Sequence, residues 1–328
     1  MRQFMRAVLL ALLTAGLFVG LAAPAVAGTV ATSTLTLTGP SSAPRAQELT
    51  LDGTLTSGGA PLAAATLQVS KTDLKGSHTL PDATTAGDGS YSVTDTPLVG
   101  GTVRYTVSFA GDATHGPASK SIKVNVSRSA TTVKIKTNRA RYAYNKLATV
   151  TAHLGNTYSN RKLSIYAKPY GHARKLLKTA KVNSNGNLTV TKNVTLKTTF
   201  IATFSGDERW APASASTHVL VHAHVRTAVA GVKHRDGKYR VYSATDGGAI
   251  AIKVSPNKAG KTVKFVLQVR RDGAWRQVDS DRETLNSSSV IAVGFWGNPD
   301  HKYRIRGQWG GDAANLAQAG KWQYAEFV

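Results

Sequence analysis

One short pattern occurs three times along the chain and constrains its fold more than any other feature. Each copy is a Gly-Asp pair, and the pairs, 95 and 105 residues apart, are Gly111-Asp112, Gly206-Asp207 and Gly311-Asp312. Aromatic and other apolar residues at alternate positions precede each pair, and a second alternating segment follows it. Alternation turns one face of a strand toward a core, and Gly and Asp are typical turn residues. Each copy therefore predicts a β-hairpin at the end of a repeated unit.

The other segments of each unit recur in the same order. Short stretches rich in Thr, Val and Ile open the three units, as STLTLTG, TTVKIKTN and VRTAVAGV, and Gly, Asn and Asp separate the stretches that follow. Such spacing is typical of a β-sandwich, and the period of three to four residues that indicates a helix is missing beyond the N-terminal segment. The chain is therefore predicted to be all-β, with three tandem sandwich domains.

The first residues are expected to be removed from the chain. Arg2 and Arg6 precede an apolar stretch over residues 7–23, and small residues follow at Ala25 and Ala27. This arrangement is typical of a secretory signal peptide. A membrane anchor is the alternative, but the apolar stretch is short for a membrane span. We assign residues 1–27 to the signal peptide, 28–127 to domain 1, 128–222 to domain 2 and 223–328 to domain 3.

The second Gly-Asp hairpin resembles a known repeat family. Residues 204–216 read FSGDERWAPASAS, which is similar to the last hairpin of bacterial Ig-like domain repeats, with its aromatic-x-Gly-Asp, a further aromatic and Pro-x-Ser. Residues 105–119 match with His115 in the aromatic position, whereas the third copy lacks the Pro and the Ser. The resemblance implies tandem Ig-like β-sandwiches of a secreted or surface protein with a structural or adhesive role, and it implies no catalytic residues.

The net charge of +23 is distributed unevenly among the domains. Residues 128–222 contain 16 Lys and Arg against 2 Asp and Glu, whereas residues 28–127 contain 6 against 7 and residues 223–328 contain 17 against 9. A cationic surface attracts polyanions, although a high net charge also serves solubility. Basic residues interleaved with Tyr between positions 158 and 181 are the candidate polyanion-binding site, namely Lys162, Lys168, Arg174, Lys175, Lys178 and Lys181.

Domain 3 contains four of the five Trp residues of the chain. Trp309 alternates with Ile305 and is predicted to lie in the core. Trp275 follows Arg270 and Arg271 across a predicted turn, and it is the candidate for an exposed aromatic that stacks on sugar rings or nucleobases. The alternative is that all four Trp side chains fill cores or interfaces, because large aromatic residues are mostly buried.

Two sets of side chains could bind metal ions. His218, His222 and His224 would project to one side if a single strand carried them, and a His-x-His pair can bind zinc or copper. The chain has no Cys, no nearby carboxylate completes this set, and we expect no metal site. The Gly-Asp carboxylates could bind calcium, but calcium needs six to eight oxygen ligands, and we predict structural turns instead.

The sequence favours a binding or structural protein over an enzyme. Nucleophile-elbow, metalloprotease and P-loop motifs are missing, and the acidic residues of domain 3 alternate with Arg, which is typical of a solvated face. We expect a non-enzymatic secreted or cell-wall-associated protein without cofactors and without a transmembrane segment in the mature chain. The expected partners are anionic cell-wall polymers or polysaccharides, or extracellular DNA bound without sequence preference. Carbohydrate binding or adhesion through the domain 3 aromatics is the alternative.

Overall fold

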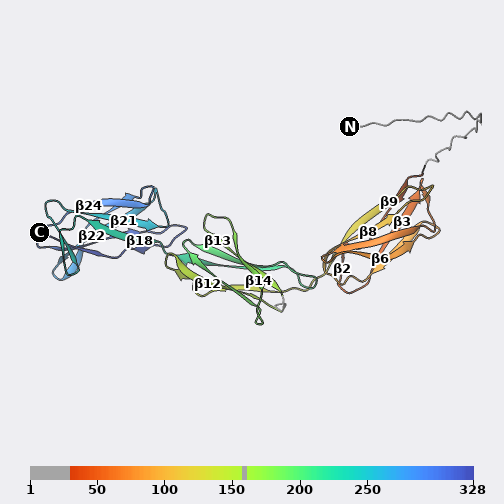
Figure 1. Ribbon diagram of the computed structural model, residues 1–328, viewed down its shortest axis with the longest axis horizontal. Coiled ribbons are helices and arrows are strands. Elements are labelled where there is room, and N and C mark those ends of the chain that lie inside the picture. Colours follow the sequence, from red (N-terminus) through yellow and green to blue (C-terminus); the bar gives the residue numbers. More distant parts are fainter. Residues whose placement is uncertain (1–29, 157–160) are drawn as a thin grey trace, which may run out of the picture.

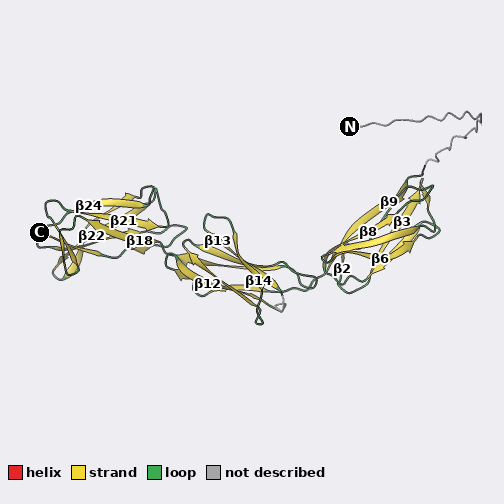
Figure 2. Ribbon diagram, in the orientation of Figure 1, coloured by secondary structure: helices red, strands yellow, loops and turns green. Residues whose placement is uncertain are grey.

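Every regular element that the structure describes is a β-strand. The computed structural model describes residues 30–156 and 161–328, and within these ranges it contains strands and no helix (Figure 2). Consequently no helix that could span a membrane is found there. The all-β prediction is confirmed, because the alternating segments place successive side chains on opposite faces of strands. The predicted signal peptide, residues 1–27, lies outside the described residues.

The first sandwich consists of a smaller and a larger sheet. The smaller sheet has the order β1-β3-β4 with β7 also paired to β3, and the larger has the order β2-β9-β8-β5-β6. The strands are β1 (Ser33–Leu35), β2 (Ser42–Ala43), β3 (Leu49–Ser57), β4 (Ala60–Pro61), β5 (Thr66–Asp73), β6 (Gly76–Thr84), β7 (Ser90–Asp95), β8 (Gly101–Phe109) and β9 (Ala118–Val126).

The second sandwich repeats this plan. Its smaller sheet has the order β10-β12-β15, and its larger sheet has the order β11-β17-β16-β13-β14. The strands are β10 (Val133–Thr137), β11 (Arg141–Tyr142), β12 (Lys146–Leu154), β13 (Lys162–Pro169), β14 (Lys175–Lys181), β15 (Asn187–Val194), β16 (Thr198–Phe204) and β17 (Ala213–Val221).

The third sandwich has the same plan with a wider larger sheet. Its smaller sheet has the order β18-β21-β24, and the larger has the order β19-β20-β27-β25-β22-β23 with β26 also paired to β25. The strands are β18 (His224–Ala230), β19 (His234–Asp236), β20 (Tyr239–Tyr242), β21 (Gly248–Ser255), β22 (Thr262–Arg271), β23 (Ala274–Thr284), β24 (Val290–Phe295), β25 (Lys302–Trp309), β26 (Gln318–Ala319) and β27 (Gln323–Phe327).

Each pair of sheets encloses its own hydrophobic cluster. The clusters extend over residues 35–126, 142–221 and 223–327, and no residue belongs to two of them. Removing apolar surface from water contributes about 25 cal/mol per Å², so three such cores can stabilise a chain without disulfides. The predicted domain boundaries fall between the clusters, and the independence of the three domains stays a prediction.

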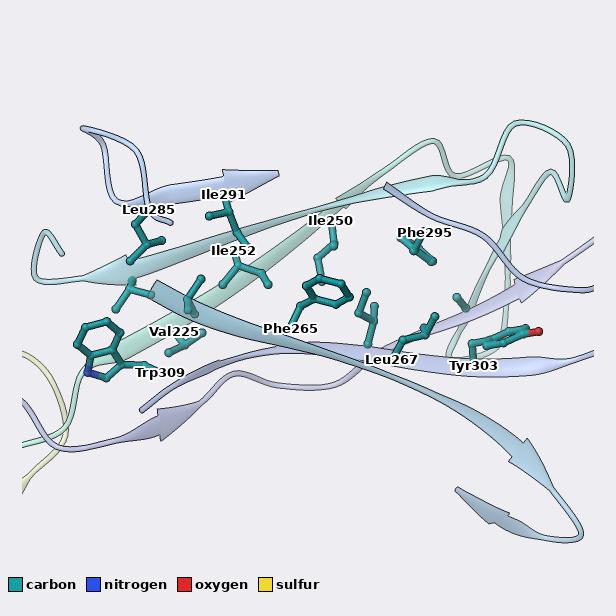
Figure 3. Packing of buried hydrophobic residues seen from close by; sticks show 14 of the residues in the cluster. Val225, Ile250, Ile252, Phe265, Leu267, Leu285, Ile291, Phe295, Tyr303 and Trp309 are labelled. Carbon is teal, nitrogen blue, oxygen red and sulfur yellow. The ribbon is translucent and has the colours of Figure 1, made fainter. Parts of the chain in front are cut away.

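The third core shows how one motif residue is used. Trp309 lies at the end of the core that also holds Leu285, while Phe295 and Tyr303 lie toward the other end (Figure 3). Trp309 is only 4% exposed, which confirms the prediction from its alternation with Ile305. The aromatic residue before the Gly-Asp pair is therefore a core residue of the sandwich.

The three Gly-Asp pairs form turns with the same hydrogen bonds. The glycines have positive φ values of 82°, 80° and 92°, a conformation that residues with a Cβ rarely adopt. In each turn the Asp amide donates to the carbonyl three residues later, and the Asp Oδ1 accepts from two backbone amides of the turn. The carboxylate therefore stabilises the turn by accepting hydrogen bonds from its backbone amides.

Two of these turns also contact the short connections between successive sandwiches, residues 126–132 and 221–227, which we call the first and second joint. Figure 1 shows the sandwiches following one another in a row. Ser129, in the first joint, exchanges two backbone hydrogen bonds of 2.8 and 2.9 Å with the turn around Trp210. Leu316 exchanges two of 2.8 and 3.1 Å with the second joint, on either side of His222. Each joint is thus paired as a short parallel bridge with the sandwich that follows it.

The preceding sandwich contacts the same turns from the other side. Gly100 donates its amide to the Glu208 carbonyl at 2.8 Å, and Lys197 donates its amide to the Ala314 carbonyl at 2.8 Å. Lys75 adds an ion pair with Glu208 at 3.1 Å. Backbone groups prefer to be paired, and these hydrogen bonds connect the two sandwiches across each joint. The Gly-Asp turns therefore close the hairpins and also bind the joints.

Candidate anion-binding surfaces

The six basic residues predicted for polyanion binding lie on one hairpin. Antiparallel pairing of β13 with β14 places Lys162 opposite Lys181, and it places Lys175 opposite Ala167, the neighbour of Lys168. We call residues 162–181 the basic hairpin. All six side chains are exposed, namely Lys162, Lys168, Arg174, Lys175, Lys178 and Lys181. The fold therefore places on one hairpin charges that are spread over twenty positions of the sequence, with Lys162 and Lys181 on its outer face and Lys175 and Lys178 on the face of the buried Ala167 and Ile165.

Two of these side chains are held by neighbours. The Arg174 guanidinium carbon lies 4.3 Å from the ring centroid of Tyr166, which orients it through a cation–π contact. Lys178 Nζ donates to the Thr189 carbonyl at 3.4 Å. Tyr170 is exposed, whereas Tyr158 lies outside the described residues.

The charge of the basic hairpin is not neutralised by ion pairs. Within residues 30–156 and 161–328, the ion pairs of Lys and Arg are Lys71–Asp95, Lys75–Glu208, Arg161–Asp207 and Lys258–Asp312. The two acidic residues of domain 2 are thus paired with other cations than these six, Asp207 with Arg161 and Glu208 with Lys75 of domain 1. The hairpin therefore presents six uncompensated positive charges to solvent.

The structure corrects the expectation of an uncovered ring at Trp275. Trp275 is half-buried on β23, and the Arg304 guanidinium carbon lies 4.6 Å from its ring centroid. The Tyr324 ring lies 5.9 Å away, centroid to centroid. Arg270 lies opposite Trp275 in the β22–β23 ladder, and both Arg270 and Arg271 are exposed. Part of the ring surface that a sugar would need is therefore occupied by a side chain of the protein itself.

Sequence reasoning missed a row of polar side chains on β25. Its core residues alternate with four half-buried residues that share the outer face of the larger sheet, namely Lys302, Arg304, Arg306 and Gln308. The row could have been predicted from the sequence, because period-two alternation assigns every second residue of a strand to its outer face. The spatial neighbours of this row, Trp275, Trp322 and Tyr324, come from other strands or from outside strands, so their contacts were not visible in the sequence.

Trp296 is an exposed aromatic that sequence reasoning did not single out. It follows β24 directly, and its side chain is 59% exposed. A Cβ on Gly247 would come within 2.5 Å of its Nε1, and a Cβ on Gly294 within 2.7 Å of its ring. The indole therefore rests on the backbone of two glycines, and the sequence contains no local pattern that indicates this.

The three histidines do not share a strand, which corrects the premise of a His cluster. His218 lies on β17 and His224 begins β18, in a different sheet. His222 lies between them, where its Nδ1 is 2.8 Å from the Ala317 carbonyl oxygen. His224 stacks on Tyr144 with 6.3 Å between ring centroids. The chain passes from one sandwich to the next here, which separates the histidine environments.

The Gly-Asp carboxylates are engaged with protein groups. His115 Nδ1 lies 2.8 Å from Asp112 Oδ2, and together with the turn hydroxyl and amides it holds the pKa of Asp112 well below its usual range. Lys258 Nζ lies 2.7 Å from Asp312 Oδ2. Burial raises the pKa of Asp312, but Lys258 and two backbone amides outweigh it and the net shift is downward. In the part of the chain that is described, no group of three His, Asp or Glu residues is arranged to hold a metal ion.

A shallow hollow lies beside the edge of the second sandwich. It is lined by residues of β10, β12, β15 and β17 that include Lys134, Lys136 and His153. His153 Nδ1 lies 3.1 Å from the Asn187 Oδ1. The lining combines two cations and one imidazole without a carboxylate, which suits an anion better than acid–base chemistry.

A scan against protein-family models finds no match to this sequence, and neither does a search of curated protein sequences. Among solved structures, a tetra-tandem repeat from the extending region of a large adhesion protein is similar over 90% of this chain and 74% of that chain, at 15% identity and a TM-score of 0.46. A Salmonella alpha-2-macroglobulin is similar over 91% and 24%, at 12% identity and a TM-score of 0.25. The Yersinia pseudotuberculosis adhesin InvE is similar over 58% and 59%, at 18% identity and a TM-score of 0.30. Each TM-score is below 0.5, so function is inferred from the chain's own residues.

Proposed function

We propose that this chain is a non-enzymatic, secreted or cell-wall-associated protein of tandem Ig-like sandwiches that binds anionic envelope polymers through domains 2 and 3. The observation that carries the proposal is the basic hairpin. Six exposed cations lie on one β-hairpin, and in the described part of the chain none of them is paired with a carboxylate. Domain 1, with 6 Lys and Arg against 7 Asp and Glu, would act as a spacer.

Electrostatics explains why such a hairpin would favour a polymer over a single small anion. Each exposed Lys contributes little by itself, because its charge is screened within about 8–10 Å at physiological ionic strength. A polyanion contacts several cations at once and releases condensed counterions from each contact, which makes binding strong at low salt and steeply salt-dependent. No base-reading motif is present in the sequence, so DNA would be bound through its phosphates without sequence preference.

The test measures sedimentation of the mature chain with isolated cell walls at several salt concentrations. We expect co-sedimentation at low salt that is lost as salt rises. The test variant changes the six hairpin residues to Gln, and a charge-matched control changes Lys120, Lys123, Arg139, Arg141, Lys146 and Arg209 to Gln. The test variant should lose binding, while the control should retain most of it. Binding that ignores salt, or that falls equally in both variants, would contradict the proposal.

A second candidate function is carbohydrate binding through domain 3, and Trp296 is the observation that favours it. Its ring is 59% exposed and is supported from below by Gly247 and Gly294, so it can stack on the apolar face of a sugar ring without rearrangement. Trp275 fits this role less well, because Arg304 covers part of its ring. Glycan-array binding of Trp296→Ala and Trp275→Ala variants tests the assignment. Loss with the first variant alone supports Trp296, and unchanged binding by both excludes this route.

A further inference from the structure

The outer face of β25 holds two arginines next to each other in a row of aromatic rings. Antiparallel pairing places Arg304 opposite Tyr324 of β27 on one side and opposite Gln268 of β22 on the other. Arg306 is the next residue on the same face of the strand. Successive residues on one face are about 6–7 Å apart, so the two arginine side chains leave the strand side by side.

Two indoles lie against these guanidinium groups, and one of them contacts both. The guanidinium carbons of Arg304 and Arg306 each lie 4.2 Å from the ring centroid of Trp322. Arg304 also lies 4.6 Å from the ring centroid of Trp275. A guanidinium stacked on a ring keeps its N–H groups in the plane of the stack, where they remain able to donate hydrogen bonds.

Two glutamines accept hydrogen bonds from the guanidinium groups and orient them. Arg304 Nε donates to Gln268 Oε1 at 2.7 Å. With its amide oxygen facing the guanidinium, Gln308 accepts from Arg306 Nε at 3.0 Å and from one terminal nitrogen at 2.8 Å. Each Arg has five N–H donors, so both keep donors for a further partner. The side chains are therefore oriented before any ligand arrives, which reduces the entropy lost on binding.

The two positive charges have no carboxylate partner. In residues 30–156 and 161–328, no Asp or Glu oxygen lies within 4.0 Å of either guanidinium. Glu326, the acidic residue of β27, lies opposite Lys302 and not opposite either arginine. Burial, together with the charge of Arg304, lowers the pKa of Arg306. Holding two like charges in partly buried positions costs free energy, and a bound anion would offset this cost.

We propose that Arg304 and Arg306, held by Trp322 and the two glutamines, form a binding site for a tetrahedral oxyanion group, a sulfate or a phosphate. A planar carboxylate matches one guanidinium in a two-bonded pair. A tetrahedral group presents oxygens in several directions and can accept from two guanidiniums at once. Lys302 and Lys264, which lie on the same face of β25 and β22, would guide the anion to the site. This site is separate from the basic hairpin and does not depend on it.

The site is tested by NMR titration of the mature chain, following the Arg Nε–H and Trp Nε1–H resonances. The probes are inorganic sulfate, inorganic phosphate and dextran sulfate, with chloride at matched ionic strength as the control anion. We expect saturable shifts at Arg304, Arg306 and Trp322 with a sulfate or phosphate probe and not with chloride. Saturation by the inorganic ions identifies a free-ion site, and saturation by dextran sulfate alone identifies a substituent on a polymer. Absence of saturable shifts at these resonances with all three probes overturns the proposal, whatever any variant does.

A matched pair of variants separates the site from general charge. Arg304→Lys/Arg306→Lys keeps both charges but loses the planar fork, and it should weaken binding at least tenfold. Arg270→Lys/Arg271→Lys alters two exposed arginines of the same sheet and should change binding less than twofold. Equal weakening by both pairs, or none by the first, contradicts the proposal. The basic-hairpin variant should keep the Arg304 and Arg306 shifts, so failure of the proposed wall binding and failure of this site are distinguishable.

Discussion

The β5–β6 and β13–β14 hairpins occupy the same place in two sheets and carry different surfaces. Each lies at the end of a larger sheet with the same strand order, and each has a register shift in its pairing. Residues 66–84 contain two Lys and two Asp, whereas residues 162–181 contain six Lys and Arg and neither Asp nor Glu. The repeated fold therefore leaves the charge of this hairpin free to differ.

The inner faces of the two hairpins are equivalent. Leu67 and Val69 on β5 are 0% and 1% exposed, and Leu163 and Ile165 on β13 are both 0% exposed. Since alternate residues of a strand face the core, only half of the positions must be apolar for the sandwich to form. The comparison teaches that fold and surface chemistry are encoded by interleaved positions of the same strands.

The largest expected effect tests the equivalence of the inner faces. Leu67→Ala and Leu163→Ala should each lower the free energy of unfolding of their sandwich by about 2–5 kcal/mol, through lost burial and a residual cavity. Urea denaturation of the full chain measures both, with Thr66→Ala and Lys162→Ala as exposed controls expected to change it by under about 0.5 kcal/mol. If either core variant behaves like its control, the two hairpins are not equivalent in the fold.

The next effect tests the difference in charge between the two hairpins. Changing the six cations of the basic hairpin to Gln should weaken binding to duplex DNA more than about 100-fold at low salt. It should also reduce the slope of log affinity against log salt by ~5, because each phosphate contact contributes about 0.9 to that slope. Fluorescence anisotropy measures both quantities. Replacing Lys71 and Lys75 of the β5–β6 hairpin by Gln is the control, and a comparable loss there would remove the distinction between the hairpins.

A third test compares the Gly-Asp turns of the first and third sandwiches. Lys258 is buried with Asp312 as its ion-pair partner, whereas Asp112 is exposed beside His115. Asp312→Ala should lower the free energy of unfolding by about 1–3 kcal/mol, because it leaves the Lys258 ammonium without its partner. Thermal melting at pH 7 measures the loss, and a change of under 0.5 kcal/mol would mean that water replaces the carboxylate.

The same pair predicts a dependence on pH. The pKa of Asp312 is lowered in the folded chain. The carboxylate therefore contributes to stability above its unfolded-state pKa of about 3.9, and this contribution is lost as pH falls below that value. Between about pH 5 and pH 3, the wild-type chain should therefore lose more stability than Asp312→Asn does. Parallel curves for the two proteins over this range would show that the carboxylate makes no pH-dependent contribution.

The smallest effect concerns the ion pair across the first joint. Lys75 and Glu208 are 3.1 Å apart with side chains 56% and 35% exposed. Such pairs contribute about 0–1 kcal/mol, so Lys75→Ala should leave the melting temperature nearly unchanged. Small-angle scattering should also show little change, because the Gly100 to Glu208 backbone hydrogen bond remains. A marked gain in flexibility would mean that side chains, and not backbone pairing, hold this joint.

The all-β architecture, the Gly-Asp hairpins and the core position of Trp309 could be predicted from the sequence. All three depend on local signals, because period-two alternation and turn residues act within a few positions of the chain. The basic residues between positions 158 and 181 were also identified from the sequence, but their folding into the β13–β14 hairpin was not predicted. The histidine cluster was wrong because it assumed a single strand through VHAHVRT, although the predicted boundary between domains 2 and 3 falls within that segment.

Tertiary structure alone decided the environments of the aromatic residues and the second role of the turns. Trp275 is covered by Arg304, which is 29 positions away in sequence, and Trp296 is exposed because two glycines beneath it leave room for its ring. The Gly-Asp turns pair with joints about 80–95 residues away. Such contacts depend on which strands become neighbours and in which register, and no local pattern specifies that. The sequence by itself thus determined the strands and their inner faces, whereas the sheets decided which outer side chains meet.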